Sequence, residues 1–348
     1  MWKVTNNINK KILEKFNKLI INQFFLILIN LAYKIEKGII SNTSLNIDLW
    51  KKSKYYNYSN SKLLDYIFNI QYKKTPLKEV VNEVLKTQKL DSIVKYYKLY
   101  KEQNNNIDNF IYSIDVIKID SNISIIFRKY FYEVMFNDEY IWKTIHGKVY
   151  NRDIFHKNFV KENNYIQVCP YCDLDTFLAN ANKNVEHMLP KSKFPFLAMN
   201  GNNLLSSCHA CNSPSEGKGV LAKTPIIFPY NTEVGEYLNF KIKQHDKKIE
   251  INVNDNKATD IQLRNKLNNY LELLKLKKRY EKTEVFISYN SQISRIYDVV
   301  SGFGYNKEQF DGYLSKRYLI DSKKDILIFA IKNNFENYDD YKIYFGIK

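Results

Sequence analysis

Four residue types are scarce in this chain, whose 348 residues include only 4 cysteines, 5 histidines, 7 prolines and 10 glycines. It also lacks an apolar run near the roughly 20 residues of a membrane span, because Asn22, Gln23 and Asn30 interrupt the most apolar stretch, Leu19–Ile35. No basic start with a small-residue cleavage site marks a signal peptide, and no internal repeat is present. The apolar fraction of 45% excludes a disordered chain. The sequence therefore predicts a folded cytoplasmic protein without a membrane segment.

Acidic residues are also in deficit, since 37 Asp and Glu face 53 Lys and Arg and give a net charge of +16. The excess is uneven: residues 1–100 hold 18 basic and 7 acidic residues, residues 101–220 are neutral, and residues 221–348 hold 22 against 17. Basic flanks around a neutral centre are typical of a protein that binds a polyanion. A lysine-rich surface without any partner has the same composition, so charge alone leaves both interpretations open.

Hydrophobic spacing predicts an α+β protein that is mostly helical, and the chain length suits two or three domains. Residues 1–155 are expected to form a basic, mainly helical domain, residues 160–230 a central domain with every cysteine, and residues 231–348 a C-terminal domain. In this last part a strand-like stretch, 237–253, precedes a helical pattern. The helix that follows is predicted to carry a basic stripe at helical spacing, formed by Lys275, Lys278, Arg279 and Lys282.

The cysteines form two Cys-x-x-Cys pairs, with Cys169 and Cys172 in "CPYC" and Cys208 and Cys211 in "CHAC", separated by 35 residues. A redox dithiol domain uses one such pair at a helix N-terminus and leaves the second pair without a role. A tetrahedral zinc ion needs four thiolates, which two tight turns can supply. Disulfides are disfavoured in a cytoplasmic protein. The spacing therefore predicts a structural Zn²⁺ site, with a redox dithiol as the less favoured alternative.

The segment between the two pairs carries polar side chains that a simple zinc ribbon does not need. Glu186 and His187 lie in the short apolar stretch "NVEHML", Asn202 and Asn203 precede two leucines, and Asn212 follows the last cysteine. A zinc ion bound at both ends of this segment would hold a strand, a loop and a helix start together. A glutamate on an apolar strand is costly without a partner, which favours a functional pair over a satisfied core histidine.

These features occur in the order of a known motif: a Cys-x-x-Cys knuckle, an acid–His pair, a Pro-Lys-Ser turn, an Asn-Leu pair, and a second knuckle followed by Asn. In this order, residues Cys169–Gly219 resemble the HNH endonuclease family. The resemblance implies a central zinc-stapled ββα-metal core, one catalytic Mg²⁺ or Mn²⁺ ion, and hydrolysis of phosphodiester bonds in DNA. Together with "PIIFPY" soon after, the segment looks most like the HNH effectors of Septu-type and retron-type anti-phage systems, which act beside an ATPase partner subunit.

The resemblance also assigns roles to individual residues. His187 corresponds to the general base, and a neutral imidazole suits the removal of a proton from water. Glu186 and Asn212 correspond to the ligands of the catalytic divalent ion, which prefers hard oxygen donors. Asn203 corresponds to the asparagine that pins the loop and orients the base. The chain departs from the family pattern after Asn212, where "SPSEGKG" delays Lys218, so contact of Lys218 with a phosphate stays open.

Two other functions fit parts of the sequence. A non-catalytic zinc-stapled nucleic-acid-binding module would keep the cysteines and the basic flanks, but it needs none of Glu186, His187 and Asn212. Their joint presence favours the enzyme. RNA is an alternative substrate, because a one-metal site attacks either phosphodiester and because Lys51–Lys74 interleaves lysines with aromatic residues, as proteins that bind single strands do.

Overall fold

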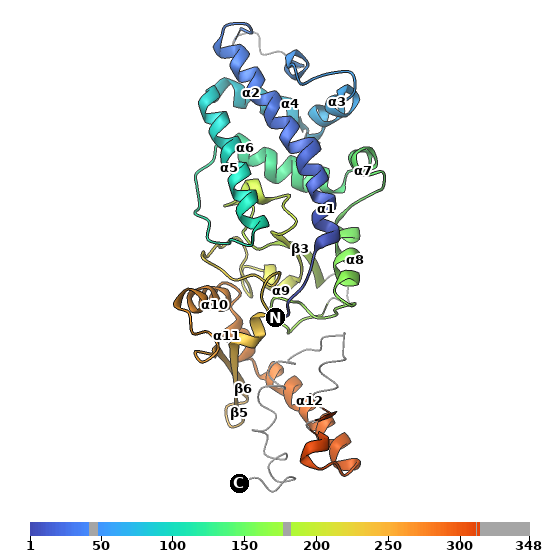
Figure 1. Ribbon diagram of the computed structural model, residues 1–348, viewed down its shortest axis with the longest axis vertical. Helices are drawn as coiled ribbons and strands as arrows, with labels where there is room; N and C mark the ends of the chain where they lie inside the picture. Colours follow the sequence, from blue (N-terminus) through green and yellow to red (C-terminus); the bar gives the residue numbers. More distant parts are fainter. Residues whose placement is uncertain (42–47, 177–181, 311, 314–348) are drawn as a thin grey trace. The chain divides into compact units, whose positions relative to one another are not determined.

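The computed structural model describes residues 1–41, 48–176, 182–310 and 312–313 of the chain (Figure 1). The described chain divides into two compact units, each discontinuous in sequence. Unit 1 comprises Met1–Thr5, Val160–Glu186 and Ser206–Lys348, and unit 2 comprises Asn6–Phe159 and His187–Leu205. The three domains expected at 1–155, 160–230 and 231–348 stay a prediction, and residues 311 and 314–348 of the last one lie outside the described residues.

Unit 2 is mainly helical, and it begins with a helical stretch that runs without a break from α1 (Asn7–Phe16) through the π-helical η1 (Asn17–Ile21) into α2 (Asn22–Glu36). The following elements are, in chain order, η3 (Leu49–Lys52), α3 (Ser61–Asn69), β1 (Gln71–Tyr72), β2 (Thr75–Pro76), α4 (Leu77–Thr87), α5 (Leu90–Asp108), α6 (Ser121–Ile125), η4 (Ile126–Val134), η5 (Met135–Asn137), α7 (Glu139–His146) and α8 (Arg152–Glu162). Side-chain caps start some of these helices. The Asp138 carboxylate, for example, accepts the backbone N–H of Ile141 at the first turn of α7.

An aromatic core joins the helices of unit 2 to the segment that follows His187. The ring of Phe25 on α2 contacts Tyr97 and Tyr100 of α5, Phe127 of η4 and Phe196, with centroid separations of 5.0–6.1 Å. Phe196 belongs to the short turn η7 (Pro195–Leu197), and its ring centroid lies 4.8 Å from that of Phe127. Such ring pairs stabilise a core beyond the area that they bury. Segment 187–205 is therefore anchored in the helical core by a side chain of its own.

The helical stretch Asn7–Glu36 is, among the described residues, the one that is long and apolar enough to cross a membrane. Many of its apolar side chains, including Leu13, Phe16 and Leu28, are buried within unit 2, whereas Ile8 and Leu19 are exposed. A core helix that is covered on several sides has the same composition as a membrane span. The cytoplasmic location expected from the sequence stays a prediction.

A buried asparagine ties three parts of unit 2 together. Asn9 on α1 is fully buried, and its amide nitrogen donates to Asn6 Oδ1 at 2.7 Å and to the carbonyl of Phe155 at 3.0 Å. Its amide oxygen accepts from the Tyr150 hydroxyl at 3.0 Å and from Asn158 Nδ2 at 3.1 Å. Every donor and acceptor of this side chain is used, which is the condition under which a polar group can be buried without a large cost.

Unit 1 contains the short central strands and the C-terminal elements. These are β3 (Lys183–His187), β4 (Leu204–Cys208), α9 (His209–Asn212), η8 (Val234–Tyr237), β5 (Leu238–Lys243), β6 (Lys248–Val253), α10 (Ile261–Leu273), α11 (Leu276–Tyr280) and α12 (Thr283–Gly302). Strands β3 and β4 form one sheet, and each of them passes from one unit to the other.

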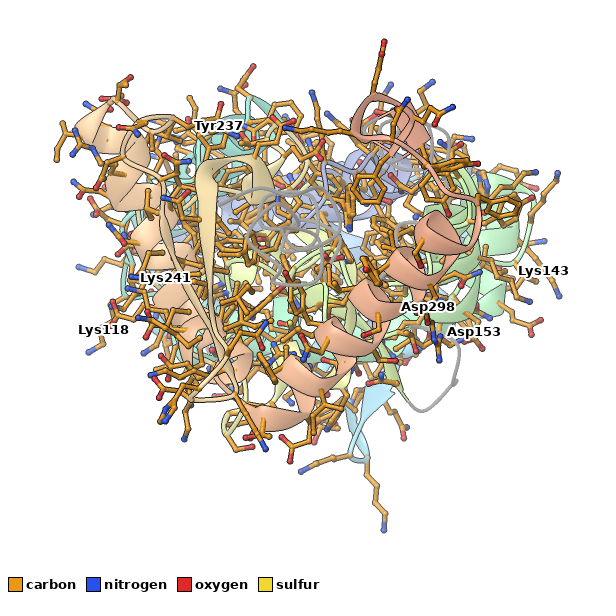
Figure 2. The ribbon with its side chains drawn as sticks, turned by 90° about the horizontal axis from the view of Figure 1, so that it is seen from below. Lys118, Lys143, Asp153, Tyr237, Lys241 and Asp298 are labelled. Atoms are coloured by element: carbon orange, nitrogen blue, oxygen red, sulfur yellow. The ribbon has the colours of Figure 1, made fainter. Side chains whose placement is uncertain are left out.

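The strand-like stretch predicted at 237–253 is confirmed as the antiparallel hairpin β5–β6, in which Phe240 pairs with Ile251. Both of these side chains are buried, whereas Lys241, the residue after Phe240 on β5, is exposed (Figure 2). In the described residues the chain forms this hairpin, the β3–β4 sheet and the small β1–β2 sheet, each with two strands. The fold is thus mixed and mainly helical with small sheets, in agreement with the sequence.

The predicted basic stripe on a single helix is wrong. Helix α10 ends at Leu273, Lys275 adopts a left-handed backbone conformation with φ of 51°, and α11 starts at Leu276. Helix α11 ends at Tyr280, so of the four residues only Lys278 and Arg279 belong to it, whereas Lys275 precedes it and Lys282 follows it. Arg279 points into the protein and is 4% exposed.

We predict that Asn9→Ala lowers the free energy of unfolding of unit 2 by roughly 2–4 kcal/mol, because it leaves the Tyr150 hydroxyl and the Phe155 carbonyl buried without their partner. Urea denaturation followed by circular dichroism measures this difference. The matched control is Asn105→Ala at an exposed position of α5, which should change stability by less than about 0.5 kcal/mol. Equal effects of the two substitutions would contradict the role assigned to Asn9.

Candidate metal centre and the segment that it brackets

The four cysteines converge in the interior of unit 1. Cys169, Cys172, Cys208 and Cys211 are all fully buried, and their sulfurs lie within 4.8 Å of one another. The Cys169–Cys211 and Cys172–Cys208 sulfur pairs are 3.9 and 3.8 Å apart. Four sulfurs placed tetrahedrally at about 2.3 Å from a zinc ion are separated by roughly 3.8 Å. The cluster therefore fits a zinc ion, and its single group of four thiols does not fit a redox dithiol with a spare pair.

Backbone N–H groups of the second Cys-x-x-Cys turn point at sulfurs of the cluster. The N–H of Cys208 points at Cys169 Sγ at 3.3 Å, and the N–H of Cys211 points at Cys208 Sγ at 3.4 Å. Amide dipoles aimed at sulfur stabilise thiolates, the form in which cysteine binds metals. After the first knuckle the chain turns at Asp173, which takes a left-handed φ of 59° that aspartate tolerates better than most residues.

A buried arginine balances the charge of the cluster. Arg279 of α11 donates to Cys211 Sγ at 3.1 Å and to Asp175 Oδ2 at 2.6 Å, and the same carboxylate oxygen lies 3.1 Å from Cys208 Sγ. Burial opposes the charge of Arg279, but the neighbouring Cys172 and Cys211 raise its pKa, so the guanidinium stays protonated. Zinc with four thiolates has two excess negative charges, and one buried guanidinium offsets half of them. Nothing in the sequence pattern indicated this role.

Other members of the predicted basic stripe surround the second knuckle. Lys275 Nζ donates to the carbonyls of Pro214 and Ser215 at 2.7 and 3.1 Å. Lys282 pairs with Glu216 at 2.7 Å. These contacts hold the loop after α9, so we do not regard Lys275 and Lys282 as a free face for nucleic acid.

Lys218, in the loop after the second knuckle, forms an ion pair with Glu186. The Lys218 ammonium lies 2.5 Å from Glu186 Oε1, with Lys218 fully buried and Glu186 6% exposed. The backbone N–H of Lys218 donates to the Cys211 carbonyl at 3.1 Å. A Cβ atom at Gly217 would lie 2.2 Å from that same carbonyl oxygen, so only glycine allows this approach. The sequence left the role of Lys218 open, and in the structure it is the buried counter-ion of Glu186.

His187 lies in unit 2, where two contacts fix its ring. Its Nε2 is 3.0 Å from the carbonyl oxygen of Ala198, and a carbonyl can only accept, so Nε2 is the donor and, in the neutral ring, Nδ1 is the nitrogen without a proton. The ring also packs edge-on against Tyr132, with centroids 4.4 Å apart. The imidazole is 4% exposed and thus held in one orientation.

Asn203 braces the same loop that His187 contacts. Its amide nitrogen donates to the carbonyls of Leu189 and Leu197 at 3.0 and 3.3 Å, and its amide oxygen accepts the N–H of Leu189 at 2.8 Å. The side chain is fully buried. Since Ala198 follows Leu197 directly, Asn203 and His187 hold adjacent residues of one turn. This is the bracing that the family resemblance implies for Asn203, while a part in catalysis stays a prediction.

The predicted ligands of the catalytic ion both fall in unit 1, whereas His187 and Asn203 fall in unit 2. Glu186 lies on β3 and is the last residue of that strand that belongs to unit 1. Asn212 is the half-buried final residue of α9. Their carboxylate and amide oxygens are of the type that Mg²⁺ and Mn²⁺ prefer. The ion pair with Lys218 neutralises Glu186 without a metal, and the roles of both residues as ligands stay predictions.

Comparison with known proteins gives one local similarity. A stretch of 61 residues, 18% of this chain, is 41% identical to Septu protein PtuB from Bacillus thuringiensis. The stretch covers 23% of that protein. No family model matches the chain, and no solved structure matches it. The local match agrees with the resemblance to Septu-type proteins found in the motif, and the chain as a whole is not assigned to a family.

We predict that the purified protein contains about one zinc ion per chain. The Cys169→Ser variant should lose this zinc, and unit 1 should no longer show a cooperative unfolding transition. Structural zinc contributes roughly 10–16 kcal/mol of apparent binding free energy in small zinc domains, more than a typical domain stability. Metal analysis by mass spectrometry and calorimetry measure the two effects. Ser215→Ala, at an exposed position beside the second knuckle, is the matched control. A folded wild-type protein without zinc would refute the assignment.

Proposed function

We propose that this chain is a metal-dependent endonuclease of the HNH type that hydrolyses phosphodiester bonds in DNA as part of an anti-phage defence system. One observation carries the proposal: the four-cysteine cluster brackets the segment that holds Glu186, His187 and Asn203, and Asn212 follows the last cysteine at once. The local identity to Septu protein PtuB supports the defence context. The resemblance of the motif to the HNH effectors of Septu-type and retron-type systems further suggests an ATPase partner subunit.

His187 is the general base of the proposed reaction. With its proton on Nε2, donated to the Ala198 carbonyl, the ring presents Nδ1 to a water molecule. Nδ1 takes one proton from this water as the water oxygen forms a bond to phosphorus. The bond from phosphorus to the 3′ oxygen breaks, and the departing oxygen takes a proton from solvent water, which leaves a 5′-phosphate and a 3′-hydroxyl. Tyr132 and Asn203 keep the ring and its turn in place, so little reorganisation is needed in the chemical step.

Glu186 and Asn212 are the residues that would hold the catalytic divalent ion. When bound, such an ion stabilises the negative charge that develops on the phosphate oxygens and on the leaving 3′ oxygen. Glu186 is ion-paired with Lys218 through Oε1, so the Lys218 ammonium and a metal ion would compete for the same carboxylate. The affinity for the ion thus depends on the stability of a buried salt bridge.

The Glu186–Lys218 pair also favours the second candidate function, a zinc-stapled nucleic-acid-binding module without catalysis. In that case Lys218 is the permanent partner of Glu186, and the carboxylate has a structural role only. Cleavage assays on plasmid DNA and on RNA, with and without Mg²⁺ or Mn²⁺, separate the binding module from the nuclease and DNA from RNA as substrate.

We predict that His187→Ala and His187→Gln reduce plasmid cleavage in Mg²⁺ by roughly 10²–10⁴-fold, the usual effect of removing a general base. The glutamine variant retains a donor for the Ala198 carbonyl, so it separates loss of the base from loss of the hydrogen bond. Zinc content, thermal unfolding and DNA binding of this variant should match the wild type.

His245→Ala is the control for these variants, because His245 is fully exposed in the β5–β6 turn and should be dispensable.

Glu186→Ala and Asn212→Ala should also lose cleavage. Excess Mn²⁺ should restore part of the activity of these two variants and none of the activity of the His187 variants. Cleavage at the wild-type rate by nuclease-free His187→Gln would remove His187 as the base and make the binding module the better proposal.

We further predict that Lys218→Met destabilises unit 1 by roughly 3–5 kcal/mol in zinc-loaded protein freed of other divalent ions, because it removes the cation paired with the buried Glu186 carboxylate. If Glu186 is a metal ligand, added Mn²⁺ replaces that charge. Mn²⁺ should then raise the midpoint of thermal unfolding more in Lys218→Met than in the wild type.

The double variant Glu186→Gln, Lys218→Met is the matched control, since it has neither charge. It should be insensitive to Mn²⁺ in the same thermal titration. An equal response of the single and double variants to Mn²⁺ would mean that the ion binds elsewhere and that Glu186 is not a ligand.

A further inference from the structure

Tyr132 of η4 is the centre of a cationic cluster beside His187 in unit 2. Its ring is 5% exposed and takes the edge of His187. The Lys191 ammonium lies 4.3 Å from the ring centroid, and the Arg152 guanidinium carbon lies 4.8 Å from it. Arg152 also donates to the Tyr132 carbonyl at 3.0 Å. The tyrosine therefore positions the candidate base and two cations around one ring.

The cluster contains more positive than negative charge. Lys129 and Lys191 both pair with a single carboxylate oxygen of Glu133, at 2.8 and 3.0 Å. Arg152 is a third cation near them. The pKa of Lys191 is lowered, mainly by burial. Lys129 and Arg152 lower it further, and Glu133 opposes them. Like charges held this close repel one another, and an anion bound among them relieves the repulsion.

The Lys191 side chain is accessible to a ligand, and backbone hydrogen bonds hold the turn in which Lys191 lies. Its side chain is 28% exposed, so a solvent-borne anion can reach it. It lies in the turn after β3, where the N–H groups of Lys193 and Phe194 both donate to the Pro190 carbonyl at 2.9 Å. Arg152 is the first residue of α8. The two cations thus come from distant parts of the sequence, and each has a rigid support.

We propose that Lys191 and Arg152 form a binding site for a backbone phosphate of the nucleic-acid strand that His187 acts on. This inference rests on the proposed function. Arginine offers a planar fork of donors to phosphate oxygens, and lysine offers a point charge, so the pair suits a phosphodiester. Tyr132 is a positioning residue, because its ring places both cations and the imidazole. The two cations determine where the strand lies relative to Nδ1 of His187.

The test measures binding separately from cleavage. In the His187→Gln background, without added divalent ions, a fluorescent DNA duplex is titrated by anisotropy at several salt concentrations. Lys191→Gln and Arg152→Gln should each weaken binding about 5- to 10-fold at 0.1 M salt and reduce the slope of log K against log salt by roughly one, as the loss of one phosphate contact does. Tyr132→Phe should bind as the parent does, whereas Tyr132→Leu should weaken binding as much as losing one of the cations.

Lys143→Gln is the matched control, because Lys143 is an exposed lysine on α7 that pairs with Glu139 (Figure 2). The inference is overturned if Lys191→Gln and Arg152→Gln change the salt slope no more than Lys143→Gln does, or if the parent does not bind DNA. Failure of the proposed function is a different result, in which His187→Gln cleaves plasmid at the wild-type rate while the two cation variants still show a reduced slope.

Discussion

Two pairs of thiols that are far apart in sequence meet in one buried cluster, and the arrangement of unit 1 depends on that meeting. Helices α10 and α11 close over it, with the Tyr270 hydroxyl donating to the Tyr171 carbonyl at 2.6 Å and the Tyr280 hydroxyl donating to the Cys172 carbonyl at 2.8 Å. Arg279 adds a charge that complements the sulfurs. A metal ion bound there would tie both ends of the segment between the knuckles to one rigid point.

A second constraint acts within that segment and is independent of the cysteines. His187 and Asn203 hydrogen-bond to neighbouring residues of one turn, and Phe196 of the same turn fills the aromatic core of unit 2. The imidazole is therefore oriented by hydrophobic packing as well as by hydrogen bonds. If His187 is the base of the proposed reaction, preorganisation of this kind lowers the cost of ordering it when a substrate binds.

The sequence predicted the parts of this molecule that depend on short-range spacing. Two Cys-x-x-Cys turns need only local geometry to offer four sulfurs, and alternation along 237–253 defines a hairpin. The Glu186–Lys218 pair was beyond such reasoning, since the path of the loop depends on the absence of a side chain at Gly217, where the Cys211 carbonyl lies. The basic stripe failed because helical spacing assumes a continuous helix, whereas α11 starts after the left-handed residue Lys275 and ends at Tyr280, before Lys282.

The discontinuity of unit 2 has a consequence for the order in which the chain folds during synthesis. The rings of Phe25 and Phe127 leave the ribosome well before Phe196, which completes their packing. Until then the nascent helices have a gap in their aromatic core, and an unfilled core is less stable and more open to misfolding. The turn that orients His187 is thus among the last pieces to close the helical unit. A protein in which that turn has not formed would lack the oriented imidazole and part of its core at the same time, so the local geometry of His187 and the stability of unit 2 would be lost together.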